Sequence, residues 1–381
     1  MPDQCELFSL ASPHPGKMLR QFLEQRGWTQ EELASITGKR RQTICDIVSG
    51  NSGISSEMAV IFAAVFGNTA EEWLRWDSLY RLATTEADGT DAAKRAHLYG
   101  LVPVREMQKR QWIQPTDDLI ELESELKRFF GVPSLEEGFA FPLAAHGPVN
   151  LIGINPAETA WCFRARQLAG ALTVAPFDPF RLAAAEGELR ELAAYPKEAR
   201  HLPRLLGEYG IRFVIVEPLS GARIDGAAFW LDAESPVIAL SVRYDRIDAF
   251  WFTVMHEWAH IKNGDALSVD TDLIDPTVGL TVVLVENEAE RLASKQASDA
   301  LIPSSEMDSF IHRVGPMYSK ERIIQFAHKV KIHPGIIVGQ LQHRNEIGYS
   351  ANREMLVKVR ATIVESALTD GWNKTITPGL L

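Results

Sequence analysis

The spacing of apolar residues predicts helices over most of the chain. Residues 14–83 fit short helices separated by turns, and residues 158–200 are helical again with a break at "APFDPF". Between them, "TDDLIELESELKRFF" (116–130) has one apolar stripe, and Thr116 is its predicted N-cap. After Pro303 the pattern is helical once more, to about residue 347. The chain is therefore predicted to be mainly helical.

A different pattern predicts strands in the middle of the chain. "IRFVIVEP" (211–218), "AAFWL" (227–231) and "PVIALSV" (236–242) are apolar, β-branched or aromatic, with "DGA" and "DAESP" as the turns between them. The helix that contains "TVMHEWAHIKNGD" (253–265) follows. We expect an α+β protein in which a small mixed β-sheet packs on this helix. The tail, "TDGWNKTITPGLL", has no clear pattern, which is typical of a disordered end.

The length of 381 residues indicates two or three domains. The polar, small-residue segment "TTEADGTDAAKR" (84–95) is a candidate linker. We therefore expect a helical domain over 1–83, a linker and helical connector over 84–199, a core with the strands over 200–305, and a helical region and tail over 306–381.

Composition and charge narrow the classes of function. Apolar residues make up 46% and charged residues 23%, an ordinary globular balance, and no stretch predicts a membrane span. Asp3 and Glu6 lie where a signal peptide needs positive charge, and the three cysteines form no CxxC pair, so we expect a cytoplasmic protein without disulfides. A net charge of −11 excludes a uniformly basic surface, so any DNA contact must come from a local patch.

The segment "WTQEELASITGKRRQTICDIVSGNSGIS" (28–55) predicts a helix-turn-helix. Thr29 and Glu32 have the spacing of a capping box, and Gly38 lies where the two helices must turn sharply. The second helix then begins with polar residues, and this end enters the major groove in a helix-turn-helix. Arginine pairs with guanine and glutamine with adenine, while Gln30 lies where a phosphate contact is expected. The predicted DNA-binding residues are Gln30, Arg40, Arg41, Gln42 and Thr43.

Periodicity alone also fits a small helical bundle with a basic turn, but the segment resembles the Cro/C1 (XRE) class of helix-turn-helix proteins. The stretches "HPGKMLRQFLEQRGWTQEELA" and "GISSEMAVIFAAVFGNTAEEWLRWDSLYRLA" are similar to HigA-type antitoxins over about residues 12–83. The resemblance implies a five-helix domain that binds operator DNA as a homodimer and represses its own operon.

The spacing His-Glu-x-x-His in residues 256–260 predicts a metal site. Residues four apart on a helix lie about 40° around its axis and about 6 Å along it, so His256 and His260 share one face. Glu257 is rotated by about 100°, close enough to face a water bound to the metal. The bare pattern also arises by chance, but here it lies on a helix apolar enough to be buried, and Gly264 and Asp265 end that helix.

The region 200–305 resembles the ImmA/IrrE family of zinc-dependent metallo-endopeptidases. Their pattern continues with Glu-x-x-Ala-Asn/Asp-x-Phe-Ala and ends on Leu-hydrophobic-Pro; alignment on "LIP" (301–303) places Glu290 on the ligand glutamate. Ser294 and Gln296 depart from the pattern, so Glu286, one turn earlier, stays open as the alternative ligand. The resemblance implies a zincin-like domain that holds Zn²⁺ through His256, His260 and Glu290, with Glu257 as general base.

Other parts of the implied site stay open. A side chain that stabilises the oxyanion is usual, and the candidates are Tyr244, His312, Tyr318 and His343. The segment "PVIALSV" is a candidate edge strand to which an extended substrate adds.

Together these signals predict a DNA-binding transcriptional regulator with a zinc endopeptidase domain. Its expected substrate is a repressor, an antitoxin or the protein itself, in a toxin–antitoxin or stress response. The alternative is a non-catalytic antitoxin and autorepressor whose C-terminal part binds a toxin or a ligand around a structural metal. A third interpretation is a repressor without a metal.

Overall fold

The computed structural model describes residues 14–85, 89–136, 139–141, 149–150, 155–265, 267–271 and 288–376. It forms two compact units, Met1–Thr90 and Asp91–Leu381. We call them the first and the second unit and describe each by itself. Among the described residues, no helix has the length and apolar character needed to cross a membrane.

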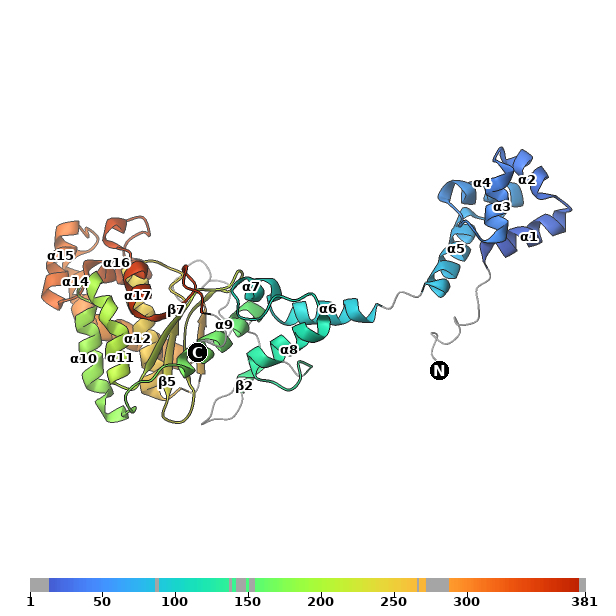
Figure 1. Cartoon of the computed structure of the whole chain (residues 1–381). Helices are drawn as coiled ribbons and strands as arrows, with labels where there is room; N and C mark the ends of the chain where they lie inside the picture. Colours follow the sequence, from blue (N-terminus) through green and yellow to red (C-terminus); the bar gives the residue numbers. More distant parts are fainter. Residues whose placement is uncertain are drawn as a thin grey trace. The chain divides into compact units, whose positions relative to one another are not determined.

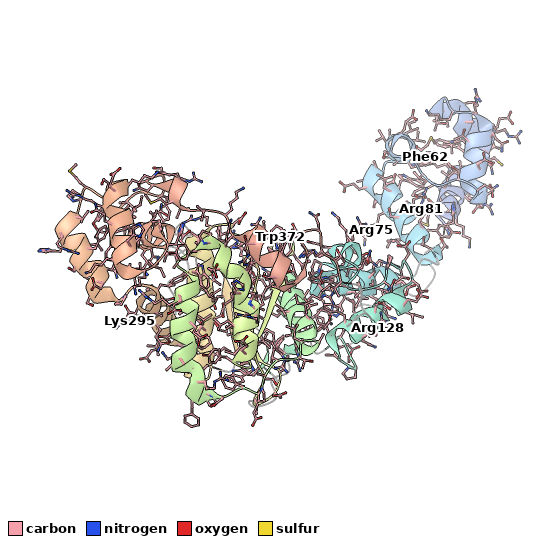
Figure 2. All side chains as sticks on the ribbon, turned by 60° about the vertical axis from the view of Figure 1, so that its left-hand side comes forward. Phe62, Arg75, Arg81, Arg128, Lys295 and Trp372 are labelled. Carbon is pink, nitrogen blue, oxygen red and sulfur yellow. The ribbon has the colours of Figure 1, made fainter. Side chains whose placement is uncertain are left out.

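The described residues of the first unit form five helices around their own core, as predicted for residues 14–83. Thr29 and Glu32 form the predicted capping box, and Gly38 ends the second helix in the left-handed conformation, with φ 65°. Leu33, Ile44 and Phe62 are fully buried; Figure 2 marks Phe62. The helices are α1 (Pro15–Arg26), α2 (Gln30–Thr37), α3 (Arg41–Ser49), α4 (Ser56–Phe66) and α5 (Ala70–Thr84).

The second unit begins with helices where part of the linker was expected. Helix α6 covers Thr90–Leu101, so the predicted linker over 84–95 is too long: its second half is helical. The predicted helix over 116–130 is α8 (Leu119–Phe130), but its N-cap is Asp118 rather than Thr116. The Asp118 carboxylate accepts from the backbone N–H groups of Ile120 and Glu121, both at 2.9 Å, and a carboxylate caps a helix at least as well as a hydroxyl.

A five-stranded mixed sheet lies at the centre of the second unit, in the order β6-β4-β5-β3-β7. Strand β4 pairs antiparallel with β5 and β6, whereas β3 pairs parallel with β5 and β7. A separate two-stranded ribbon joins β1 (Ala140–Phe141) and β2 (Val149–Asn150). The strands of the large sheet are β3 (Arg212–Val216), β4 (Ile224–Trp230), β5 (Pro236–Leu240), β6 (Leu267–Thr271) and β7 (Leu368–Asp370).

Helices cover both faces of this sheet, and successive strand residues alternate between two cores. Val214 and Phe229 belong to the core shared with α8 and α9, whereas Ile215 and Ala228 belong to the core shared with α12. Figure 1 shows α7, α8 and α9 on one side of the sheet and α10, α11 and α12 on the other. The first group includes α7 (Val104–Lys109) and α9 (Pro156–Gly170); the second includes α10 (Leu182–Leu192), α11 (Leu202–Glu208) and α12 (Ile247–Asn263).

Helix α12 is the element predicted to carry the metal site. It packs on β4 and β5, and against α13 and α16. Gly264 ends it in the left-handed conformation, as the sequence predicted. The chain then continues through β6 to the helices α13 (Glu288–Leu301), α14 (Ser304–Val314), α15 (Lys320–Val330), α16 (Pro334–His343) and α17 (Arg360–Ser366).

Three sequence predictions about the sheet are wrong, and pairing partners explain each. "DGA" (225–227) forms no turn but lies inside β4, where the register shifts between Ile224 and Gly226. "PVIALSV" contains β5, which is a central strand between β4 and β3 and not an edge. The tail is not disordered throughout, because Leu368–Asp370 adds to β3 as strand β7.

Candidate metal centre and DNA-binding helix

The two histidines of α12 face one another inside the second unit. His256 is 0% and His260 is 1% exposed. Their Nε2 atoms lie 3.0 Å apart, which places both possible ligand atoms at one point. The four-residue spacing on a helix produces this arrangement, as the sequence predicted.

Glu290 reaches the same point from the first turn of α13. Its Oε2 lies 3.2 Å from His256 Nε2 and 3.4 Å from His260 Nε2. The predicted set of His256, His260 and Glu290 is therefore brought together. The alternative ligand Glu286 lies outside the described residues, and Glu288 is exposed at the start of α13.

Asp270 is a fourth candidate donor, which the sequence did not predict. Its Oδ2 lies 3.4 Å from His256 Nε2, and it comes from β6. Candidate ligand atoms of His256, His260, Asp270 and Glu290 all lie within 4.8 Å of one another. The polar Ser268 and Asp270 alternate with apolar neighbours in "LSVDT", and this period of two would have indicated that they share one face of a strand.

Outer hydrogen bonds fix the orientation of both imidazole rings. His260 Nδ1 lies 2.7 Å from Asp265 Oδ2, and His256 Nδ1 lies 3.3 Å from Ser294 Oγ. Contacts of this kind hold the other ring nitrogen, Nε2, toward a metal. The contact to His256 comes from the Ser294 hydroxyl on α13.

Glu257 is buried on the same helix without a hydrogen-bond partner for either carboxylate oxygen among the described residues. Its carboxylate packs against Gly226 of β4, where an added Cβ would lie 2.2 Å from Oε1. Burial, and then the charge of Asp270, raise the pKa of Glu257 well above its ordinary value. Burial therefore favours the neutral form of this carboxyl group over its charged form.

The remaining members of the cluster form a network of opposite charges. Burial opposes protonation of His256, but Asp270 and Glu290 together raise its pKa to about 9. Burial likewise acts against ionisation of Glu290, but hydrogen bonds from His256 and His260 lower its pKa. The two imidazoles thus lie against both carboxylates, His256 against Asp270 and Glu290 and His260 against Glu290.

The donor set fits a zinc ion. Zinc prefers imidazole nitrogen, thiolate and carboxylate ligands in a tetrahedral arrangement, and this cluster offers two imidazoles and two carboxylates. The orphaned carboxylate of Glu257 beside it is a second sign that a cation completes the site. With three protein ligands a position stays open for another molecule, whereas Asp270 as a fourth ligand would close it.

Two of the candidate oxyanion groups have structural contacts that argue for packing roles. Tyr318 donates its hydroxyl hydrogen to Glu346 at 2.6 Å, and burial and this bond raise its pKa to about 12. The Tyr244 ring lies 4.7 Å from the Arg243 guanidinium carbon. His312 is exposed on α14, and His343 lies 6.5 Å from the Phe252 ring, between centroids.

The predicted DNA-binding residues gather at the N-terminal end of α3. Arg40 is its exposed N-cap, and Arg41 and Gln42 are exposed in the first turn. Gln42 donates to Asp46 at 2.8 Å, so its side chain is held along the helix. Thr43 is half-buried, and Gln30, also half-buried, begins α2. Ile44, Ile47 and Val48 occupy the opposite, buried side.

Comparison with known proteins identifies the first unit. A helix-turn-helix family model matches residues 19–74. Antitoxin HigA-1 of Vibrio cholerae serotype O1 is 35% identical over 74 residues, which cover 17% of this chain and 70% of the relative. The chain belongs to the HigA antitoxin family. The first unit of this HigA-family chain is a DNA-binding helix-turn-helix domain of the antitoxin and regulator type.

Other relatives of the HigA-family chain were also found. Virulence-associated protein I of Dichelobacter nodosus is 32% identical over 76 residues, covering 20% of this chain and 70% of the relative. Among solved structures, the antitoxin GraA is 28% identical with a TM-score of 0.21, covering 22% of this chain and 91% of its own. A HigA-family addiction module antidote protein from Coxiella burnetii is 20% identical with a TM-score of 0.19. The match covers 29% of this chain and 100% of that protein.

Proposed function

We propose that this protein is a transcriptional regulator whose second unit is a zinc-dependent endopeptidase. Its substrate is a repressor, an antitoxin or the protein itself, and cleavage relieves repression of an operon. The observation that carries the proposal is the convergence of His256, His260 and Glu290 on one point, with Glu257 on the same helix.

Each residue has a distinct part in this proposal. His256, His260 and Glu290 would hold the ion, and Asp265 and Ser294 keep the imidazoles in position. A bound zinc ion supplies a Lewis acid that polarises a peptide carbonyl. Glu257 would take a proton from the attacking water and give it to the leaving amine; burial together with a raised pKa is typical of a group that transfers protons in catalysis.

A second candidate function is favoured by Asp270. If Asp270 is a fourth ligand, the ion is closed off from substrate and stabilises the fold without catalysis. The second unit would then bind a toxin or a small ligand, and the protein would act as a non-catalytic antitoxin. An unpartnered Glu257 favours the catalytic alternative, because a closed structural site has no use for a general base.

Cleavage assays separate the two functions. The zinc-loaded protein is incubated with itself and with the repressor or antitoxin encoded beside it, and products are followed by mass spectrometry. We expect cleavage by the wild type and a loss of about 100- to 10,000-fold in Glu257→Gln. Cleavage that persists in Glu257→Gln would reject this mechanism.

Asp270→Asn supplies the complementary test. If Asp270 lies outside the coordination shell, this variant binds one zinc ion with nearly unchanged affinity. If Asp270 is the closing ligand, zinc affinity falls, and Co²⁺ substituted for zinc changes its absorption spectrum. The Co²⁺ spectrum reports coordination without reference to activity.

For the first unit, we propose binding to operator DNA as a homodimer. The polar residues at the start of α3 are the groove-contacting group, because the rest of a chain with net charge −11 repels phosphate. The DNA upstream of the gene itself is the first candidate operator, tested by gel shift. Analytical ultracentrifugation of the complex measures whether two copies bind together.

A further inference from the structure

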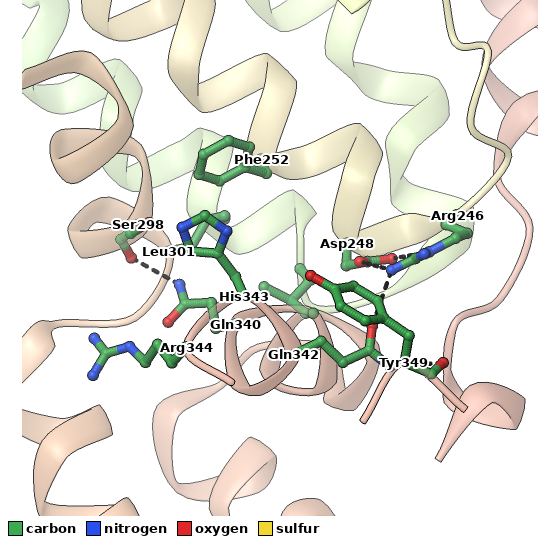
Figure 3. A pocket seen from close by; sticks show the side chains of 12 residues that line it. Arg246, Asp248, Phe252, Ser298, Leu301, Gln340, Gln342, His343, Arg344 and Tyr349 are labelled. Atoms are coloured by element: carbon green, nitrogen blue, oxygen red, sulfur yellow. Dashed lines mark hydrogen bonds and ion pairs between the residues drawn. The ribbon is translucent and has the colours of Figure 1, made fainter. Parts of the chain in front are cut away.

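A cavity of about 100 Å³, open to solvent, lies in the second unit beside the metal cluster but uses other residues. A cavity of roughly 150 Å³ binds a single benzene ring, so this one has space only for a small group such as one aromatic ring. Its walls come from α12, α13 and α16, and from Tyr349 beyond α16 (Figure 3). Phe252 lies one helical turn before His256, with 6.0 Å between the two ring centroids.

One wall of the cavity suits an aromatic group. Phe252, Leu301 and Ile336 line it, and Figure 3 shows the rings of Phe252 and His343 next to one another. Their centroids are 6.5 Å apart with an angle of 33° between the planes. A flat ring can pack against such a surface through dispersion and ring contacts.

The charged residues of the cavity are already paired. Arg246 donates to both oxygens of Asp248, at 3.1 and 2.5 Å. Arg344 pairs with Asp308 at 2.5 Å. Because these charges already neutralise one another, the cavity favours a neutral ligand over an anion or a cation.

One buried polar atom still lacks a partner. Gln340 is 9% exposed, and its Nε2 donates to the backbone oxygen of Ser298 at 3.0 Å. That bond fixes the orientation of the amide, because the nitrogen must face the carbonyl. Its Oε1 is then a buried acceptor without a partner among the described residues. A buried acceptor of this kind is costly until a donor arrives.

We propose that this cavity binds a neutral aromatic group with an O–H or N–H donor, such as a phenol. The ring packs against Phe252 and His343, and its donor completes the hydrogen bonding of Gln340 Oε1. Such a group comes either from a free small molecule or from a tyrosine side chain of a peptide. The cavity shares no ligand of the metal cluster, so this inference stands whether or not the metal is catalytic.

Matched probes test the donor directly. p-Cresol and toluene differ only by a hydroxyl group, and their binding to the full chain is measured by NMR titration with and without zinc. We expect p-cresol to bind about 5- to 10-fold more tightly than toluene, the effect of one hydrogen bond to an otherwise unpaired acceptor. Equal affinity for both probes, or no binding of either at millimolar concentration, would overturn the proposal.

Two variants locate the binding site. Gln340→Met removes the acceptor, so the preference for p-cresol should disappear while toluene still binds. Ser298→Leu places a larger side chain in the cavity and should lower its affinity for both probes at least 10-fold. Gln325→Met, on the exposed side of α15, is the matched control and should bind as the wild type does. Circular dichroism verifies that each variant is folded; persistence of the preference in folded Gln340→Met would contradict the assigned acceptor.

The two sources of the aromatic group are separated by comparing p-cresol with a capped Ala-Tyr-Ala peptide. Tighter binding of the peptide, lost in Ser298→Leu, assigns the cavity to a peptide side chain. Equal or weaker binding assigns it to a free small molecule. Failure of peptide cleavage in the experiments above leaves this outcome unaffected, because binding is measured on the metal-free protein as well.

Discussion

The second unit contains two buried polar clusters that differ in how their charges are balanced. In one, Arg164 donates to Asp370 at 2.5 Å and both side chains are 1% exposed; Trp112 donates to the same oxygen at 3.0 Å. In the other, three carboxylates, Glu257, Asp270 and Glu290, surround two histidines.

The two clusters differ in the balance of their charges. The first carries one positive and one negative group and joins α9 to β7: Asp370 Oδ2 accepts from Arg164 and Trp112, and its Oδ1 has no partner in the described part of the chain. The second carries an excess of acid and includes a carboxylate with no partner among the described residues. The excess of acid is the observation that supports our proposal of a bound cation, because an unbalanced buried carboxylate is costly.

Removal of Asp370 should have the largest effect on stability. Asp370→Ala leaves the Arg164 guanidinium buried without its counter-charge, and we expect the free energy of unfolding to fall by about 3–5 kcal/mol. Urea titration measures the change. Glu306→Ala breaks the exposed pair with Lys329 and should change stability by less than about 1 kcal/mol. Similar losses in the two variants would contradict the structural role of the buried pair.

Addition of zinc should have the next largest effect. A free zinc concentration 100-fold above the dissociation constant should raise the free energy of unfolding of the second unit by about 2.7 kcal/mol. Differential scanning calorimetry with and without a chelator measures it, and His260→Ala serves as the control that cannot hold the ion. If zinc does not change the thermal unfolding midpoint of the wild type, the result argues against the metal site.

Glu257→Gln should stabilise the metal-free protein at neutral and higher pH. The pKa of Glu257 is raised in the folded state. The stability that this residue contributes is therefore fully present below the unfolded-state pKa of about 4.3, and it is lost as pH rises and the buried carboxyl group must ionise. We expect the variant to be about 1–3 kcal/mol more stable at pH 8, with a smaller difference at pH 5. Chemical denaturation at pH 5 and pH 8 measures whether the free energy of unfolding rises, which is the opposite of the loss expected for Asp370→Ala.

Arg41→Ala extends the comparison to an exposed group. We expect operator binding to weaken by about 1–3 kcal/mol and to become less specific, because one contact to a base is lost. Thermal stability should stay unchanged, since Arg41 is exposed and begins α3. Arg75→Ala, exposed on α5, is the matched control in the gel-shift titration. An unchanged titration for Arg41→Ala would reject its role in base contact.

The sequence predicted the features that depend on residues near one another. The capping box at Thr29, the turn at Gly38 and the shared face of His256 and His260 all follow from helical geometry over a few positions. The family resemblance added Glu290, which lies on another helix.

Features that depend on long-range strand pairing were missed. The tripeptide at 225–227 has the composition of a turn, but pairing with β5 and β6 holds it extended. Asp270 comes near the histidines only because β6 pairs with β4 beside α12, and the tail becomes β7 only by adding to β3. Local propensity does not determine these partners.

The contact between Gly226 and Glu257 offers a marker for comparing genomes. A methyl group at position 226 would occupy the space of the carboxylate, since its carbon would lie 2.2 Å from Oε1. Chains that keep both histidines but carry a larger residue on this strand should have lost or moved the acid. We therefore expect a glycine 31 positions before the glutamate in chains that keep this buried acid together with both histidines.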